Sequence, residues 1–236
     1  MCVVSVAWNT HPHWQLIIAG NRDEFHARDA LPLGLWADEP SIIAGRDMLS
    51  QGTWMGVSNK GRFGVVTNIR NPEGPDPQKA SRGALVTDWL ARGVLPSALD
   101  MFNPFNLLIG DQRGVQYLTN RPSDDHMTLE DGIHGLSNAI KGESWPRKER
   151  LNRALQTWLV GAAEDPAILF DDLADAVIEH VHEHPIFIRN AVYGTRSSTI
   201  LAVDRDGAGQ IIERRFDSAG AVIGENAIMF AWPTST

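Results

Sequence analysis

The sequence predicts an α+β layered sandwich, and three observations lead to this fold class. Apolar, β-rich segments come in pairs that are joined by short turns. Amphipathic helical segments lie between these pairs, which is typical of α+β architectures. No internal repeat, low-complexity tract or linker divides the 236 residues. We therefore expect a single domain over residues 1–236.

Four pairs of strands are predicted along the chain. They cover residues 2–8 and 14–20, 53–58 and 63–68, 105–110 and 115–119, and 198–203 and 210–216. The last three pairs are joined by turns that contain Gly61, Gly114 and Gly207. Glycine adopts positive φ at little cost, so these turns favour hairpins. A further apolar run at residues 227–232 has the length of a strand.

Three helices are expected between the strand pairs. Residues 81–91 begin with Ser81, a good N-cap, and carry apolar side chains at helical spacing. Residues 146–160 begin with a proline, which suits the first turn of a helix. Residues 165–181 open with Asp165-Pro166 and repeat apolar residues every three or four positions.

Composition excludes several classes of protein. The formal net charge is -8, with 29 acidic against 21 basic residues, which argues against non-specific nucleic-acid binding. No apolar run approaches the roughly 18 residues that a membrane span needs. The N-terminus has no basic leader, and one cysteine cannot form an internal disulfide. We expect a cytoplasmic protein that needs no cofactor and binds a small molecule.

Cys2, the only cysteine, is the first candidate for chemistry. If the first hairpin turns near His11, paired positions sum to about 22, which places Cys2 near Gly20 on the next strand. Arg22 and Asp23 would then emerge beside the thiol, and a guanidinium there favours the thiolate. The alternative is an inert cysteine beside a surface ion pair.

The position of Cys2 next to the initiator favours the functional interpretation. Methionine is normally removed before a residue this small, which leaves cysteine as the first residue of the mature chain. One residue would then carry a thiol and a free α-amine, and the ordinary pKa of that amine, about 7.7–8.0, suits a general base. No separate histidine is then required.

At these residues the chain resembles the NRDE family, whose eukaryotic members are called transport and Golgi organisation protein 2. The resemblance rests on an ordered set of segments that runs through almost the whole chain. They are Met1-Cys2, residues 21–25 (Asn-Arg-Asp-Glu-Phe), 52–56, 66–68, 81–86, 105–107, 135–139 and 193–199. The middle helices carry little of the resemblance.

This resemblance implies a branch of the N-terminal nucleophile hydrolases, with a four-layered αββα sandwich. The enzymes to which the family is most similar are bile-salt and penicillin amidases with an N-terminal cysteine. Their active sites use that cysteine, an early arginine and aspartate, two asparagines and a late arginine. The matching positions in this chain are Cys2, Arg22, Asp23, Asn68, Asn138 and Arg196.

Each position has a role in the cleavage of an amide that the resemblance implies. Cys2 would attack the carbonyl, Asp23 would hold the α-amine, and Arg22 would favour the thiolate. Asn68 would stabilise the oxyanion. Asn138 would orient the substrate or the α-amine, Arg196 would support the charged centre, and Asn21, Trp54 and Thr195 would build the pocket wall. Arg22 and Asp23 are adjacent here, unlike in the amidases, so both can face Cys2 only if the strand bends.

The sequence therefore predicts an N-terminal-cysteine hydrolase that cleaves a non-peptide C–N amide bond of an unknown small substrate. The family resemblance leaves a second function open, a carrier of haem or of an amphipathic lipid or acyl ligand. Haem would then be the cargo, in a cleft lined by some of the eight tryptophans. Candidate iron ligands are Cys2, His26, His126 and the cluster His180, His182 and His184. We expect that cluster to be a solvated helix end and no metal site.

Overall fold

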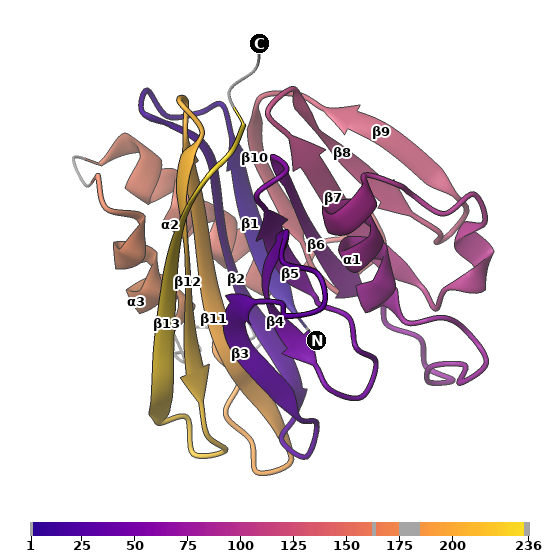
Figure 1. The fold of residues 1–236 in the computed structure, drawn as a ribbon. Helices are drawn as coiled ribbons and strands as arrows, with labels where there is room; N and C mark the ends of the chain where they lie inside the picture. The colour runs from indigo at the N-terminus through magenta and orange to yellow at the C-terminus, as the bar shows by residue number, and fades with distance from the viewer. Residues whose placement is uncertain (1, 162–163, 175–184, 234–236) are drawn as a thin grey trace.

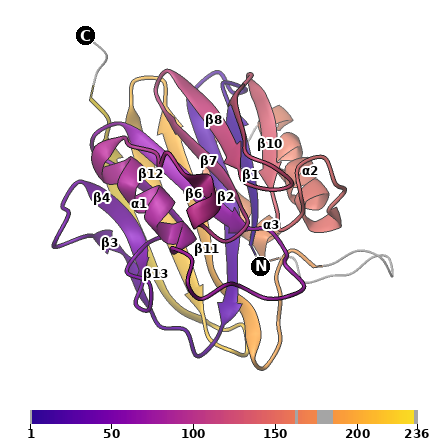
Figure 2. The same cartoon turned by 90° about the vertical axis from the view of Figure 1, so that its right-hand side faces the viewer.

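The chain forms two antiparallel sheets that stack face to face, with helices on both outer sides (Figure 1; Figure 2). The structure is a computed structural model that describes residues 2–161, 164–174 and 185–233. Helix α1 (Arg82–Arg92) covers one sheet, and α2 (Pro146–Val160) and α3 (Leu169–Leu173) cover the other. The four-layered αββα sandwich expected from the sequence is confirmed.

The first sheet has six strands in the order β10-β1-β2-β11-β12-β13. Its strands are β1 (Val3–Trp8), β2 (Trp14–Phe25), β10 (Gly132–Leu136), β11 (Tyr193–Asp204), β12 (Ala208–Phe216) and β13 (Val222–Ala231). The N-terminal strand β1 is therefore an interior strand that pairs on both sides. Cys2 directly precedes β1, beside the part of β2 that continues to Phe25.

The second sheet has seven strands in sequence order, from β3 to β9. They are β3 (Ala30–Leu35), β4 (Ile42–Asp47), β5 (Met55–Ser58), β6 (Arg62–Asn68), β7 (Phe105–Asp111), β8 (Gly114–Thr119) and β9 (Asp125–Leu129). Because each strand pairs with the next along the chain, short connections suffice for the whole sheet.

Three apolar clusters hold the four layers together. Val4, Ile18 and Phe63 belong to the cluster between the two sheets. Leu85 and Leu90 of α1 belong to a second cluster, over the outer face of the seven-stranded sheet. A third fills the space between the six-stranded sheet and α2 and α3. Alternate residues of β1 point to opposite clusters, as the two-residue period of a strand requires.

The register of the first hairpin differs from the prediction by two residues. Val4 pairs with Gly20 and Trp8 with Leu16, so paired positions sum to 24, because the loop is longer and centres on Pro12. Cys2 consequently does not lie opposite Gly20. Continued by one residue, this register puts Cys2 opposite Arg22. The shift keeps every side chain on the predicted face, since it is an even number.

Several elements differ in extent from the predicted ones. All eight predicted strands are present, but β2 continues through residues 21–25, which we expected to leave the strand. Strands β3, β4, β9 and β10 were not predicted. The helix expected over 165–181 is a 3₁₀ turn, Pro166–Ile168, followed by α3, and its remainder lies outside the described residues, as does the cluster His180, His182 and His184. None of the helices described is long and apolar enough to cross a membrane.

Candidate active site

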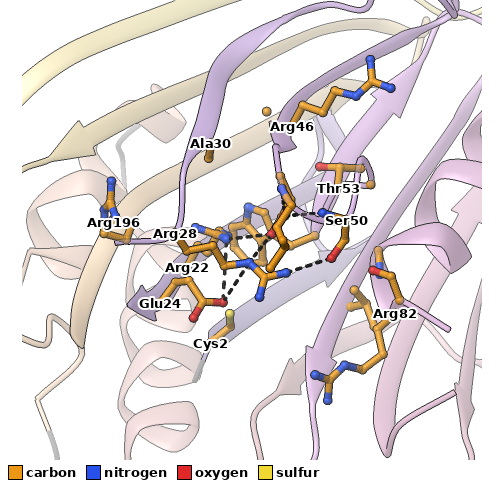
Figure 3. A pocket seen from close by; sticks show the side chains of 18 of the residues that line it. Cys2, Arg22, Glu24, Arg28, Ala30, Arg46, Ser50, Thr53, Arg82 and Arg196 are labelled. Carbon is orange, nitrogen blue, oxygen red and sulfur yellow. Dashed lines mark hydrogen bonds and ion pairs between the residues drawn. The ribbon is translucent and has the colours of Figure 1, made fainter. Parts of the chain in front are cut away.

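Cys2 lines a cavity of about 420 Å³ that opens between the two sheets (Figure 3). The walls come from β2, the segment after β4, the end of β6, the start of α1, and strands β11 and β12. Five of the sequence-predicted residues besides Cys2 also line it, namely Arg22, Asp23, Trp54, Asn68 and Arg196. Its volume lies within the range of small-molecule sites, roughly 300–1,000 Å³.

The thiol of Cys2 is buried, and its surroundings act on its pKa in opposite directions. Burial raises the pKa above its ordinary value, because the thiolate loses hydration, and the charge of Asp23 adds to this effect. A hydrogen bond from the Asp23 backbone and the charge of Arg22 lower it, but burial prevails. The structure therefore favours a neutral thiol at pH 7, which needs a base before it can attack.

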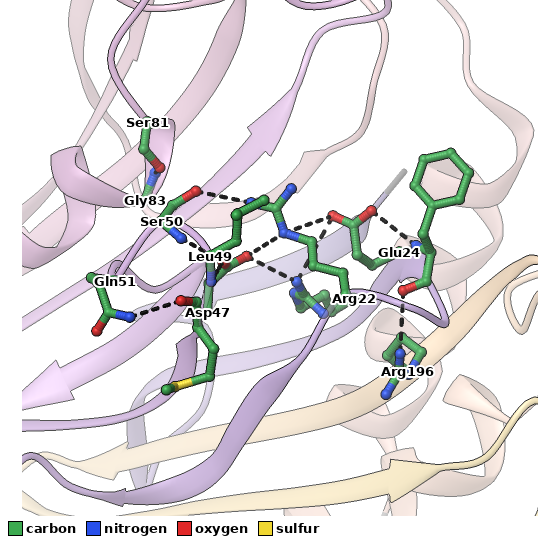
Figure 4. A network of polar contacts seen from close by, with 12 residues as sticks. Arg22, Glu24, Asp47, Leu49, Ser50, Gln51, Ser81, Gly83 and Arg196 are labelled. Carbon is green, nitrogen blue, oxygen red and sulfur yellow. Dashed lines mark hydrogen bonds and ion pairs between the residues drawn. The ribbon is translucent and has the colours of Figure 1, made fainter. Parts of the chain in front are cut away.

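Arg22 belongs to a network of ion pairs that connects the two sheets (Figure 4). Its guanidinium lies 3.3 Å from the carboxylate of Asp47 on β4 and 3.8 Å from that of Glu24. Arg28 donates to the same Asp47 oxygen at 2.6 Å and to Ser50 Oγ at 3.0 Å. Burial raises the pKa of Asp47, but the Arg28 hydrogen bond and further partners outweigh it and hold the pKa below its ordinary value. Arg22 is thus held beside Cys2 by fixed carboxylates.

Asp23 points to the opposite face of β2, because the strand continues without a bend. Its carboxylate accepts hydrogen bonds of 2.7 Å from Arg147 at the start of α2 and from Thr195 Oγ1. Burial raises the pKa of this carboxyl group, and the charge of Arg147 partly offsets the effect. Although Asp23 lines the cavity, its charged group is engaged on the helical side of the sheet.

Asn68 ends strand β6, and its main chain is held by Asn138. The Asn138 amide nitrogen donates to the Asn68 carbonyl at 2.6 Å, and Arg70 N–H donates to the Asn138 carbonyl at 2.9 Å. Asn138 is buried behind Asn68 and does not line the cavity. Its Oδ1 has no hydrogen-bond partner among the residues that the structure describes. Asn138 therefore positions Asn68.

Arg196 is the extra residue of a β-bulge in β11. Thr195 pairs with Asp23 and Ser197 with Arg22, so Arg196 has no partner of its own on β2. A bulge redirects the side chain of its extra residue. Here the guanidinium donates to the carbonyls of Phe25 at 3.2 Å and His26 at 2.5 Å. These bonds fasten the end of β2 at the cavity.

Two of the residues expected in the pocket wall lie elsewhere. Asn21 faces the helical layer, where it donates to the carbonyls of Leu173 and Ile186, because its position in β2 points away from the cavity. Thr195 is buried against Asp23 and also does not line the cavity. Trp54 does line it, as expected.

Of the candidate haem ligands, Cys2 lines the cavity, and His180, His182 and His184 lie outside the described residues. Neither His26 nor His126 lines the cavity. His26 contacts the Asn190 carbonyl, and His126 contacts the Gln116 side chain. Within the described part of the chain, no group of three histidine, cysteine or acidic residues could hold a metal ion.

Sequence reasoning missed several residues that complete the site. Arg147, Arg28 and Asp47 belong to segments that carried no recognised motif, and only the packing of β4 and α2 against β2 reveals them. Arg82 lies inside a segment that matched the family pattern, but it was given no role. The sequence offered one signal for Arg147. It is an arginine in an amphipathic helix at a position that is buried, and buried arginines need a charged partner.

The fold has the architecture of the N-terminal nucleophile hydrolases. A solved structure of a Caenorhabditis elegans ortholog of N-acylethanolamine-hydrolyzing acid amidase matches with a TM-score of 0.54 and 11% identity over 85% of this chain and 92% of that one. A variant of conjugated bile acid hydrolase from Clostridium perfringens matches with a TM-score of 0.50 and 9% identity over 100% and 97%. At these identities the likeness shows the fold alone.

The chain belongs to the Transport and Golgi organisation 2 family, whose family model matches residues 1–218. Among its curated relatives, the mouse Transport and Golgi organization 2 homolog is 28% identical over 91% of this chain and 92% of the mouse protein. The resemblance noted from the sequence segments is thereby confirmed.

Proposed function

We propose that the protein is an amidohydrolase that uses Cys2 as its nucleophile on a small, non-peptide amide. The observation that carries the proposal is the position of Cys2 in a cavity with Arg22 and Asn68 in the same walls. This set supplies a nucleophile, a positive charge and an amide N–H donor around one point. Amide plus water would yield a carboxylic acid and an amine.

The first half of the reaction forms a thioester. Sγ of Cys2 bonds to the amide carbon while the carbonyl electron pair moves to oxygen, where the Asn68 side chain donates a hydrogen bond. The α-amine of Cys2, free after removal of Met1, takes the thiol proton and passes it to the leaving nitrogen as the C–N bond breaks. Because burial raises the thiol pKa, this base is essential to the proposal.

The second half releases the acid. Water attacks the thioester carbon, its proton returns through the α-amine to sulfur, and the C–S bond breaks. Arg22 stabilises negative charge on sulfur when it forms, and Asn138 keeps the carbonyl end of Asn68 in place.

Replacement of Cys2 tests this function. The change Cys2→Ala should lower turnover of any hydrolysed amide by about 10³-fold or more, because removal of a covalent nucleophile leaves only binding and oxyanion contacts. Release of the amine from a panel of N-acyl amides is the measurement, with intact mass recorded to establish loss of Met1. Met229→Ala, an exposed change on β13, is the control. Unchanged turnover by the Cys2→Ala variant would contradict the proposal.

A second candidate function is the carriage of an amphipathic ligand such as haem in the same cavity. The neutral state that burial favours for Cys2 is the observation that supports binding without cleavage. If the protein is such a carrier, titration with haem gives a saturable Soret shift. Neither the unchanged protein nor the Cys2→Ala variant then hydrolyses amides. Absence of saturable binding contradicts it.

A further inference from the structure

The cavity carries more positive than negative side chains, although the chain as a whole is acidic. Seven basic residues line it against four acidic ones, an excess of three, whereas the net charge of the chain is -8. The basic residues are Arg22, Arg28, Arg46, Lys79, Arg82, Arg196 and Arg215, and the acidic ones are Asp23, Glu24, Asp47 and Glu213. A cavity of this charge attracts anions.

Three of these arginines are already neutralised within the protein. Arg22 and Arg28 share the carboxylates of Glu24 and Asp47. Arg46 forms two hydrogen bonds, of 2.7 and 2.8 Å, with Asp38 outside the cavity. Each of these three arginines therefore already has a carboxylate partner within the protein.

Arg82 differs from them, since it forms no ion pair with any residue that the structure describes. Its one hydrogen bond goes to the carbonyl of Pro104, at 3.3 Å. In Figure 3 it lies on the opposite side of Cys2 from Arg196, and no dashed line joins it to the other side chains drawn. Burial lowers the pKa of this guanidinium, and the Cys2 thiol is the first group to act against that effect. Among the described residues this guanidinium has no ion-pair partner, and it lies partly desolvated in the same cavity as Cys2, so it can still donate strong hydrogen bonds to a ligand.

Arg82 is also the first residue of α1, and the neighbouring Ser81 and Gly83 line the same cavity. The N-terminal end of a helix carries partial positive charge, which adds to that of the side chain. Guanidinium groups bind carboxylate and phosphate through two parallel hydrogen bonds. Two independent features of the same wall therefore favour a negatively charged group.

We propose that the substrate is an amide whose far end carries a carboxylate or a phosphate, and that Arg82 binds this anion while the amide carbonyl lies at Cys2. This inference rests on the proposed function, because it names the class of substrate for the same site. Arg196, across the cavity, is held by main-chain carbonyls and is not the anchor.

Equilibrium binding to the Cys2→Ala variant tests the proposal without any need for turnover. The probes are two matched pairs, N-hexanoylglycine with N-hexanoylglycinamide, and N-hexanoylethanolamine phosphate with N-hexanoylethanolamine. We expect the anionic member of at least one pair to bind about tenfold more tightly by calorimetry, the gain typical of a charge-assisted hydrogen bond. The pair with the larger difference identifies carboxylate or phosphate as the anion.

The contribution of Arg82 is tested by Arg82→Gln in the same background. It should remove the preference for the anionic probes and leave binding of the neutral probes unchanged. Arg92→Gln is the matched control, because Arg92 ends the same helix, is exposed and pairs with Asp88. Arg82→Lys, which keeps the charge, serves as a second variant if thermal unfolding shows that Arg82→Gln is not folded.

Equal binding of charged and neutral probes would overturn the proposal, as would a preference that survives Arg82→Gln. Failure of both anionic probes to saturate the protein also overturns it. A different result would contradict the proposed function alone. In that case the anionic probes bind more tightly than the neutral ones, but the protein with Cys2 intact hydrolyses none of the four probes. If the protein hydrolyses only the neutral amides, the proposed function holds, but the substrate does not carry the proposed anionic group.

Discussion

Cys2 combines a nucleophilic atom with surroundings that keep it protonated. Its burial raises the thiol pKa, and the nearby Arg22 does not reverse this effect because Glu24 and Asp47 already neutralise much of its charge. Cysteine nucleophiles usually need a lowered pKa or an adjacent base. Under the proposed function this base is the α-amine of Cys2, which is free only after removal of Met1.

The raised pKa predicts how Cys2 reacts with iodoacetamide while Met1 is retained. The thiolate forms only as pH rises above the ordinary value for cysteine, so alkylation at pH 7.5 should be slower in the folded than in the denatured protein and should still increase beyond pH 9. Mass spectrometry of the labelled chain measures the rate without ambiguity, since this is the only cysteine. A plateau below pH 8 would contradict the prediction, and Cys2→Ala provides the blank.

Asp23 and Arg147 form a different kind of contact, an ion pair with almost no exposure to water. Such pairs contribute little net stability, yet loss of one partner leaves a buried charge that costs about 3–5 kcal/mol. The Nε and Nη1 atoms of Arg147 have no hydrogen-bond partner in the described ranges, so the pair is incompletely satisfied. This ion pair connects the start of α2 to β2 on the side of the sheet away from the cavity.

The wall beside Arg82 depends on two glycines that let separate elements touch. A Cβ atom at Gly52 would lie 2.7 Å from the carbonyl carbon of Gly83, and one at Gly83 would lie 3.1 Å from the Thr53 carbonyl oxygen. The segment after β4 therefore packs directly on the first turn of α1. This contact explains physically why both sequence segments contain glycine.

Gly52→Ala should therefore destabilise the protein. The added methyl group meets backbone that cannot rotate away, so α1 must shift, at a cost of about 1–3 kcal/mol in the free energy of unfolding. Urea denaturation followed by circular dichroism measures the change. Gly114→Ala is the control, because a Cβ there meets nothing within 4 Å. Equal stability of the two variants would show that the contact is not tight.

The arrangement of the two sheets places Cys2 in the wall of the cavity. Strand β1 lies between β10 and β2, and the opposite wall comes from the seven-stranded sheet and α1. The cavity is thus built from segments spread between Cys2 and Ile223. No fragment of the fold contains it.

Under the proposed function, an uncleaved N-terminal tag should abolish turnover, by about 10²-fold or more, since the extension turns the α-amine of Cys2 into a peptide nitrogen. The same tag at the C-terminus should have no effect on turnover. Amide hydrolysis and thermal unfolding, measured for both tagged proteins, separate loss of chemistry from loss of folding. Full activity with an N-terminal tag would exclude the α-amine as the base.

The local sequence pattern predicted many of the strands and helices, because hairpins and amphipathic helices depend on the alternation of apolar residues and on turn residues close together in the chain. The hairpins that contain Gly61, Gly114 and Gly207 form as expected, as do the helices at 81–91 and 146–160. Strands β3 and β4 were missed because Pro32, Gly34, Gly45 and Arg46 interrupt the apolar pattern. Their pairing comes from neighbours in the sheet.

The sequence by itself determined the family and the layered class and singled out Cys2 as the candidate nucleophile, since ordered motifs and strand periodicity are properties of the chain alone. Only the tertiary structure decided that Arg22 faces Asp47 while Asp23 faces Arg147, and that Asn21 lies outside the cavity. The face on which a side chain lies, and the partner it meets there, depend on register and on elements distant in sequence. The tertiary structure likewise shows that Arg82 lines the cavity and has no ion-pair partner among the described residues, because potential partners come from segments distant in sequence.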